Sequence, residues 1–234
     1  MTADPLATSP VTDSVRADRI LAAARDLLLA WGYKRVTIDD IARRAKVGKG
    51  TVYLHWKTKE TLFVELLRRE FCEVLAAVAA RVAGDAAGAL PHRLCREVFT
   101  EHLRRPIALA LHVGDSEMLG RLTPGGHKEP AAAEGDVHAL LVRLVDVWRA
   151  HGLLTPALPA DDQVYALDAV MTGYFSDLRM VPQAQEPSSE RRADLLAHTI
   201  RATFEPAEQP DMLRLEDAAK DVLAVLARAQ GEAD

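Results

Sequence analysis

The stretch from Thr37 to Lys59, TIDDIARRAKVGKGTVYLHWKTK, constrains the fold of this chain more than any other. Thr37 is suited to cap a helix, because its hydroxyl can accept a backbone N–H and Asp40 can reach back to the cap. After it, apolar residues recur at i, i+3, i+4 and i+7, the spacing of one helical face: Ile38, Ile41, Ala42 and Ala45. The sequence therefore predicts a short amphipathic helix that begins after Thr37.

A basic turn, residues 46–48, separates this helix from a second short one that runs from Lys49 to Trp56. Gly48 is expected either to take a positive φ or to serve as a weak N-cap for the second helix. Val52 and Trp56 are four residues apart, so they can face inward together and leave polar side chains on the outer faces. Two short helices joined by a tight turn form a helix-turn-helix, which places its second helix in the major groove of DNA.

The polar side chains of this stretch have the chemistry that DNA requires. Cations bind phosphates, while hydroxyl groups and ring donors bind base edges. Ten Lys or Arg and four Asp or Glu fall between Arg16 and Lys57, although the whole chain carries a net charge of −5. A basic module on an acidic body is expected when one part touches phosphate, although an ordinary solvated charged face would have a similar balance. The residues predicted to bind DNA are Thr37, Arg43, Arg44, Lys46, Lys49, Gly50, Thr51, Tyr53, His55 and Lys59.

The pattern T-I-x-D-I-A-x-x-A, followed by V-x-K-G-T-V-Y-x-H-W-x-x-K-E-x-L, closely resembles the DNA-binding domain of TetR-family transcriptional regulators. The resemblance covers roughly residues 16–72, and two of its turn positions differ: Lys46 stands where glycine is usual, and Gly48 where serine or threonine is usual. It implies a homodimer paired through late helices, and an inducer that shifts the spacing of the two heads. It also implies that the following residues lie at the DNA surface: Thr37, Lys49, Gly50, Thr51, Tyr53, His55 and Lys59.

Beyond this stretch the apolar spacing is helical, with almost no period-two alternation. We expect an all-α fold, in which a three-helix helix-turn-helix head is joined by a long helix to a larger helical ligand-binding and dimerisation body. The expected division is a disordered tail over 1–14, a DNA-binding domain over 15–60 and a ligand-binding and dimerisation domain over 61–234. The expected helices outside the motif cover about 15–31, 59–83, 91–104, 106–122, 137–152, 161–180, 189–204 and 212–229, with a loop over 123–135.

The helix expected over 161–180 carries two apolar stripes, one of them made of small residues, so it should be buried on more than one side. Together with the helix over 189–204, it can supply half of a four-helix bundle across a twofold axis. A homodimer would read two half-sites about one helical turn (~34 Å) apart, which raises both affinity and specificity. The residues predicted to form the dimer interface are Leu167, Val170, Leu178, Leu195, Leu196, Ile200 and Phe204.

The helical body is larger than DNA binding requires, which suggests a pocket for a small molecule. Such a pocket between helices should be mostly apolar, with a few polar groups. For any one candidate, plain core or dimer interface is favoured over a place in the pocket. They are Phe99, His102, Met118, Trp148, Tyr165, Met171, Tyr174 and Phe175.

Other functional classes lack their sequence signals. His92-x-x-Cys95 and His102 could suggest zinc, but no second cluster of matching spacing completes a site, so we expect no metal and no cofactor. No Gly-rich phosphate loop, G-x-S-x-G or H-E-x-x-H is present, and we predict no catalytic residues and no enzyme activity. Two cysteines do not make a disulfide framework, and neither a signal peptide nor a bilayer-spanning run is found, so we expect a cytoplasmic protein with no membrane partner.

These observations predict a transcriptional regulator that binds a palindromic double-stranded DNA operator as a homodimer and is released by an unknown small-molecule effector. A repressor is favoured over an activator, because blocking a promoter needs no contact with polymerase. The alternative is a helical or architectural DNA-binding protein without a ligand response. That alternative predicts operator binding which no small molecule disrupts.

Overall fold

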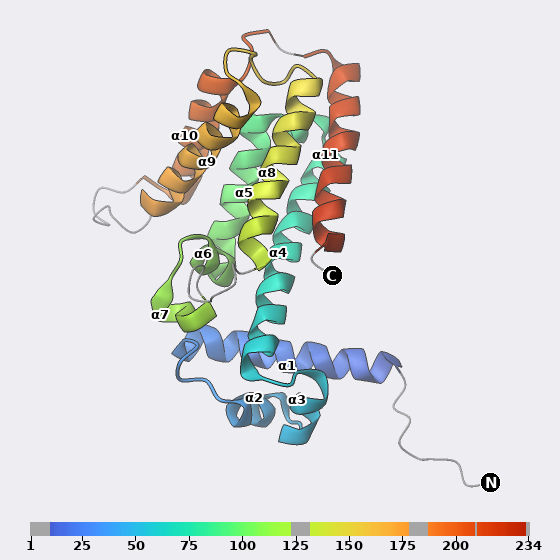
Figure 1. Cartoon of the computed structure of the whole chain (residues 1–234), viewed down its shortest axis with the longest axis vertical. Helices are drawn as coiled ribbons and strands as arrows, with labels where there is room; N and C mark the ends of the chain where they lie inside the picture. Colours follow the sequence, from blue (N-terminus) through green and yellow to red (C-terminus); the bar gives the residue numbers. More distant parts are fainter. Residues whose placement is uncertain (1–9, 123–131, 178–186, 209, 233–234) are drawn as a thin grey trace, which may run out of the picture.

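The structure is a computed structural model that describes residues 10–122, 132–177, 187–208 and 210–232. Within these ranges the chain forms helices and no β-strand, which confirms the all-α expectation. Three helices form a head at one end of an elongated molecule: α1 (Pro10–Trp31), α2 (Ile38–Ala45) and α3 (Lys49–His55) (Figure 1). The long α4 (Lys59–Gly84) leaves the head and continues along the body, as the sequence predicts.

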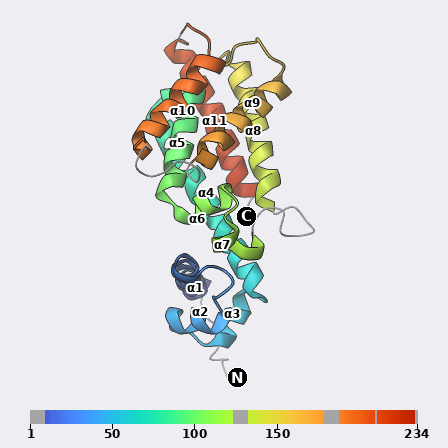
Figure 2. The same ribbon diagram turned by 90° about the vertical axis from the view of Figure 1, so that its left-hand side faces the viewer.

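The remaining helices build the body above the head (Figures 1 and 2). In chain order they are η1 (Ala86–Ala89), α5 (Pro91–Arg104), α6 (Pro106–His112), α7 (Ser116–Leu119), η2 (Gly120–Leu122), α8 (Ala132–Ala150), α9 (Ala160–Asp177), α10 (Ser189–Phe204) and α11 (Met212–Glu232). In Figure 1, α9 and α10 lie on one side of the body and α11 lies on the other. None of the described helices combines the length and apolar composition that a bilayer-spanning helix requires.

Several helix ends agree with the predicted ones, and others differ. The predicted bounds of α5 and α10 are confirmed, and α1 ends as expected before Gly32, which takes φ +72°. At its start, α1 begins at Pro10 rather than Val15, because proline fits the first position of a helix. The helix expected over 106–122 is instead broken after His112, for reasons taken up below. Helix α8 begins at Ala132, inside the predicted 123–135 loop and before the expected 137, because alanine and glutamate at 132–134 favour a helix, and it ends at Ala150 rather than at 152. Helix α11 continues to Glu232 rather than ending at 229. Residues 1–9, much of the predicted 123–135 loop and the end of the predicted 161–180 helix lie outside the described residues.

Buried apolar side chains form two clusters, here called the head core and the body core. The body core lines the helices from the upper part of α4 to α11, and its largest fully buried side chains include Trp148, Phe99 and Phe175. The head core joins α1, α2, α3 and the first turns of α4. It also takes in four residues from α6, α7 and η2: Ile107, Ala110, Leu119 and Leu122.

The head is joined to this part of the body by backbone as well as side chains. The N–H of Tyr33, in the loop after α1, donates to the carbonyl oxygen of Met118 in α7 at 2.8 Å. A Cβ on Gly120 would lie 3.1 Å from the Tyr33 ring, so the two segments are in close contact. On the other side, Arg25 of α1 forms an ion pair with Glu70 of α4 at 3.0 Å. The head is therefore held against α4 and α7 at once.

Candidate nucleic-acid interface

The first helix of the predicted motif begins as its sequence predicts. The Thr37 hydroxyl accepts the backbone N–H of Asp40 at 3.2 Å, and the Asp40 carboxylate accepts the backbone N–H of Thr37 at 3.1 Å. Both halves of the capping box are confirmed. The hydrogen bond from Thr37 is the main reason that the pKa of Asp40 lies below its usual range. The apolar stripe predicted for α2 is buried: Ile38, Ile41, Ala42 and Ala45.

In the turn after α2, the left-handed backbone conformation is taken by a lysine and not by the glycine of the turn. Lys46 takes φ +53° and ψ +46°, and its backbone N–H donates to carbonyl oxygens at the end of α2. Gly48 takes φ −68° and ψ 148° and serves as the N-cap of α3, without a side-chain hydrogen bond. Of the two roles considered for Gly48, the structure therefore shows the weak cap and not the positive φ. Lys46 takes the left-handed conformation because it directly follows the last helical residue of α2.

Helix α3 packs on the head chiefly through one side chain, and most of its other residues are exposed. Val52 is fully buried, and Trp56 caps the end of α3 and packs at the edge of the head core. Tyr53 is 44% exposed and Leu54 is 85% exposed, whereas His55 is half-buried and its Nε2 is shielded from solvent. The sequence prediction included His55 and omitted Leu54. The signal was present in the sequence, because an inward Val52 turns Leu54 outward and His55 partly inward by helical geometry.

Three of the predicted DNA-binding cations are paired within the head. Arg43 lies 2.5 Å from the Asp40 carboxylate, and Lys49 lies 2.8 Å from Asp39, which raises the pKa of Lys49. Arg44 donates to Asp26 of α1 through both Nε and Nη2, at 3.0 and 2.6 Å. Exposed pairs of this kind contribute little to stability, so a phosphate could replace the carboxylate at small cost.

Lys59 is held more firmly than a surface cation. Its Nζ donates to the carbonyl oxygens of Tyr33 and Val36 at 2.7 and 2.9 Å, and lies 4.0 Å from the centre of the Tyr33 ring. Burial lowers the pKa of Lys59. Two of its three N–H groups are thus used to close the loop between α1 and α2. Its predicted contact with DNA stays a prediction.

Other cations of the head are exposed and form no ion pair with any described residue. They are Lys34 and Arg35 before α2, the predicted Lys46, and Lys57 in the turn between α3 and α4. Lys34, Arg35 and Lys57 were not among the predicted site residues. The sequence signal was present, because all three fall within the basic segment, but only the structure shows which of its cations lack a partner.

Part of the predicted ligand-binding set comes together between α5, α6 and α9. The ring of Phe175 lies 4.9 Å from Phe99 and 5.2 Å from His102, and the hydroxyl of Tyr174 lies 2.9 Å from that of Thr199. His102 Nδ1 lies 2.8 Å from the carbonyl oxygen of Val98, which can only accept, so Nδ1 carries the proton. Burial lowers the pKa of His102, which favours the neutral ring.

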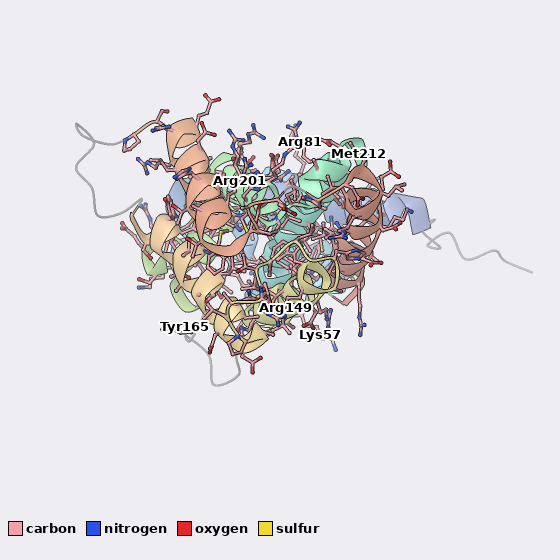
Figure 3. The ribbon with its side chains drawn as sticks, turned by 90° about the horizontal axis from the view of Figure 1, so that it is seen from above. Lys57, Arg81, Arg149, Tyr165, Arg201 and Met212 are labelled. Atoms are coloured by element: carbon pink, nitrogen blue, oxygen red, sulfur yellow. The ribbon has the colours of Figure 1, made fainter. Side chains whose placement is uncertain are left out.

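The other predicted ligand-binding residues lie apart from this group. Met118 packs against the head core, and Trp148 is buried with its Nε1 donating to the carbonyl oxygen of Ala89 at 2.8 Å. Met171 packs at the edge of the body core, whereas Tyr165 is 77% exposed and points away from α9 (Figure 3). An open cleft of about 420 Å³ lies elsewhere, where α4, η1 and α5 meet, and two ion pairs, Arg81–Glu97 and Asp85–Arg93, are part of its wall.

Most residues predicted for the dimer interface are already covered by their own chain. Leu167, Leu196, Ile200 and Phe204 are at most 2% exposed in the single chain, because α10 packs against α5 and α9 packs against α8 and α10. Val170 and Leu195 are half-buried, and Leu178 lies outside the described residues. The outward face of α9 instead carries small side chains that are exposed: Ala169, Thr172, Gly173 and Ser176.

No metal centre is evident in the part of the chain that the structure describes. There, no three side chains of His, Cys, Asp or Glu are grouped as metal ligands would be. His92 instead binds Glu205, with Nδ1 2.8 Å from the carboxylate, and links the start of α5 to the end of α10. Cys72 and Cys95 are not joined in a disulfide, and burial raises the pKa of the Cys95 thiol to about 12, so it stays protonated.

Comparison with known proteins places the similarity in sequence at the head. Residues 20–66 match the profile described as bacterial regulatory proteins, tetR family. The chain is 42% identical over 53 residues to the HTH-type transcriptional regulator QacR of Staphylococcus aureus, covering 23% of this chain and 28% of QacR. It is 50% identical over 46 residues to the uncharacterised HTH-type regulator YdeS of Bacillus subtilis, covering 20% and 23%. The match thus spans about a quarter of the length of these curated relatives.

Likeness in structure extends over the body. A transcriptional regulator of Streptomyces coelicolor, SCO4942, superposes with a TM-score of 0.57 at 25% identity, covering 81% of this chain and 98% of its own. NalD of Pseudomonas aeruginosa, described as the secondary repressor of the MexAB-OprM multidrug efflux pump, superposes with a TM-score of 0.59 at 20% identity, covering 84% and 98%. At 20% identity, the likeness to NalD concerns the fold alone: a helix-turn-helix head on a helical body.

Proposed function

This chain belongs to the tetR family of bacterial regulatory proteins, and on that premise we propose that it represses transcription by binding a palindromic operator as a homodimer. Regulators of this family are not enzymes. The observation that carries the proposal is the placement of α3, which lies at the free end of the molecule, away from the body (Figure 1). Its outward face is free to enter a groove of DNA.

The groups around α3 support contact with duplex DNA. Thr51 and Tyr53 carry hydroxyl groups that can bind base edges from the major groove. Lys46 and Lys57 flank the helix at its two ends, and both are exposed. Because phosphate contacts fix orientation while base contacts read sequence, this arrangement suits a sequence-specific binder.

We place the dimer contact on the outward faces of α9 and α10. The small exposed side chains of α9 would let a second copy approach closely, and α10 lies beside α9 with His198 and Ala202 exposed. Residues buried inside the chain, such as Leu196 and Ile200, would support this surface from below. Two heads joined in this way would read two half-sites about one helical turn (~34 Å) apart.

We place the response to an effector at the cluster of Phe99, His102, Tyr174 and Phe175. This cluster meets α6 through His112, whose ring lies 3.8 Å from that of Phe175. The same α6 contributes Ile107 and Ala110 to the head core. A ligand that separated α6 from α9 would therefore displace side chains on which the head is packed.

Selection of operators from random or genomic DNA with the purified full chain, at two salt concentrations, tests the proposal. We expect an enriched inverted repeat, and its occupancy should depend on sequence at both salt concentrations. If nothing were enriched and binding fell uniformly as salt rose, the protein would be a non-specific or architectural binder. An enriched repeat would then serve as the probe for small molecules that release the protein.

A further inference from the structure

The outward face of α3 is defined by its packing on the head. An α-helix turns by about 100° per residue, so Gly50 and Leu54 each lie about 160° around the axis from Val52, on opposite sides. Val52 is fully buried, so Gly50 and Leu54 are the two positions of α3 that point most directly away from the protein. His55 lies only about 60° from Val52 by the same geometry, which agrees with its half-buried side chain.

Leu54 has no part in the packing of the chain. At 85% exposure it is the most exposed large apolar side chain in the described residues, and it belongs to neither core. Single exposed leucines are common and need no explanation by themselves. Leu54 differs because it stands at the centre of the surface on which the proposed function depends, between Thr51 and Tyr53 on either side of the face.

The chemistry of leucine limits what this side chain can contact in the major groove. It has no donor or acceptor, so it cannot bind a phosphate or the polar edge of a base. Thymine alone among the four bases presents an apolar group there, its C5 methyl. Gly50, one turn earlier on the same face, adds no side chain to hold the helix away from the bases, and nothing lies within 4 Å of where its Cβ would be.

We infer that Leu54 is a specificity-determining residue, which selects thymine at one position of each half-site by packing against the C5 methyl group. This inference rests on the proposed function, since it assumes that α3 enters the major groove. Hydrogen bonds from neighbouring side chains would fix the register, and Leu54 would distinguish thymine from cytosine and from the purines.

The test compares thymine with deoxyuridine, which differs only by the methyl group. Within the selected operator, each thymine is replaced by deoxyuridine symmetrically in both half-sites, and binding of the full-length protein is measured. Burial of one methyl contributes about fourfold in affinity per half-site. We expect one thymine position at which this replacement weakens binding by that factor per half-site, and we expect Leu54→Ala to bind the two operators equally.

Two variants serve as controls. Leu54→Met keeps an apolar side chain and should keep the preference for thymine. Leu213→Ala removes a leucine that is 75% exposed on α11, a helix that lies in the body away from the head (Figure 1), and should behave as the unmodified protein. Because Leu54 is exposed, its replacement should leave the unfolding temperature unchanged, and a melting curve of each variant checks this.

The inference and the proposed function fail in different ways. An operator bound with no thymine sensitive to loss of its methyl, or a sensitivity that persists unchanged in Leu54→Ala, would overturn the inference and leave the regulator intact. A uniform loss of affinity for all sequences in Leu54→Ala would also overturn it, since it would make Leu54 a contact to the sugar-phosphate backbone. Failure to enrich any operator would overturn both.

Discussion

The backbone of Lys46 is held in a conformation that favours glycine. A residue with a Cβ in the left-handed helical region is disfavoured by roughly 1–2 kcal/mol, and Lys46 takes φ +53° there. The side chain of Lys46 is exposed and lies next to α3, where its charge can bind a phosphate of DNA. Such a contact would explain why lysine stands at this position. Fold stability and DNA binding would then make opposite demands on one residue.

We therefore predict that Lys46→Gly stabilises the fold and weakens binding to DNA. The free energy of unfolding should rise by about 1 kcal/mol, measured by urea denaturation, because the strain is relieved. Lys46→Ala is the matched control, since it removes the charge and keeps the Cβ, and it should show no gain in stability. A lower stability for Lys46→Gly than for Lys46→Ala would contradict this account of the turn.

Lys59 and Lys57, two residues apart, should behave differently when each is replaced by methionine. Lys59→Met removes the donor to two carbonyl oxygens and should lower the free energy of unfolding by about 1–3 kcal/mol. Lys57→Met should leave stability unchanged and reduce the dependence of DNA binding on salt by ~1 in slope. The reverse pattern would mean that Lys59 contacts phosphate and is not needed for the fold.

At the scale of elements, the sequence predicted helices best where their ends carry strong local signals. Helix α2 begins at a threonine capping box and α5 at a proline, and both were placed correctly. The helix expected over 106–122 failed because Gly114 takes φ +62° and Asp115 starts a new turn by accepting from Glu117 and Met118 N–H groups. The sequence contains this Gly-Asp pair, but the apolar residues on both sides of it favour one continuous helix.

The candidate site was predictable to a similar extent. The cap of α2, the burial of Val52 and the basic character of the head follow from residue types and spacing. The outward direction of Leu54 and the partial burial of His55 also follow, by helical geometry, once Val52 faces inward. The anchoring of Lys59 does not follow, because it depends on how the start of α4 meets the loop after α1. In the body, the aromatic group at Phe175 depends on contacts between helices that are far apart in the sequence.

The contact between α7 and the head allows a matched test with two glycines. Gly114 and Gly120 both take positive φ, +62° and +59°, so a Cβ is strained at either position. Only at Gly120 would the Cβ also meet a neighbour, 3.1 Å from the Tyr33 ring, whereas nothing lies near Gly114. We predict that Gly120→Ala lowers the unfolding free energy more than Gly114→Ala. It should also speed amide hydrogen exchange at Tyr33; equal effects of the two variants would show that α7 does not hold the head.

The ion pair between α1 and α4 should make the free energy of unfolding depend on pH. Burial raises the pKa of Glu70 above its usual 4.5, despite Arg25 beside it. A carboxyl group whose pKa is raised on folding binds more protons in the folded state, so its contribution to stability falls as pH rises from about 4.5 through the folded pKa. We predict that Glu70→Gln gains stability relative to the unmodified protein over this range. Denaturation at several pH values checks the sign, and a relative loss would mean that attraction to Arg25 outweighs burial.

At the scale of the whole molecule, the proposed dimer can be tested without disturbing the core. Ala169 and Ala224 are both exposed alanines within helices, on α9 and α11, and these two helices lie on opposite sides of the body (Figure 1). We predict that Ala169→Glu converts the dimer to a monomer in sedimentation and abolishes operator binding, because it places two charges in the contact. Ala224→Glu should do neither. A dimeric Ala169→Glu would move the contact to another surface.

The head core has a consequence for building chimaeric regulators. Ile107, Ala110, Leu119 and Leu122 complete that core although they follow the head by dozens of residues in the sequence. If the DNA-binding head were transferred to another regulator as one continuous segment, these four side chains would be missing from it. The body of the recipient protein would have to provide residues that fill the same space. Exchange of DNA specificity between such proteins is therefore simplest by substitution on α3 alone, at exposed positions such as Leu54 that belong to neither core.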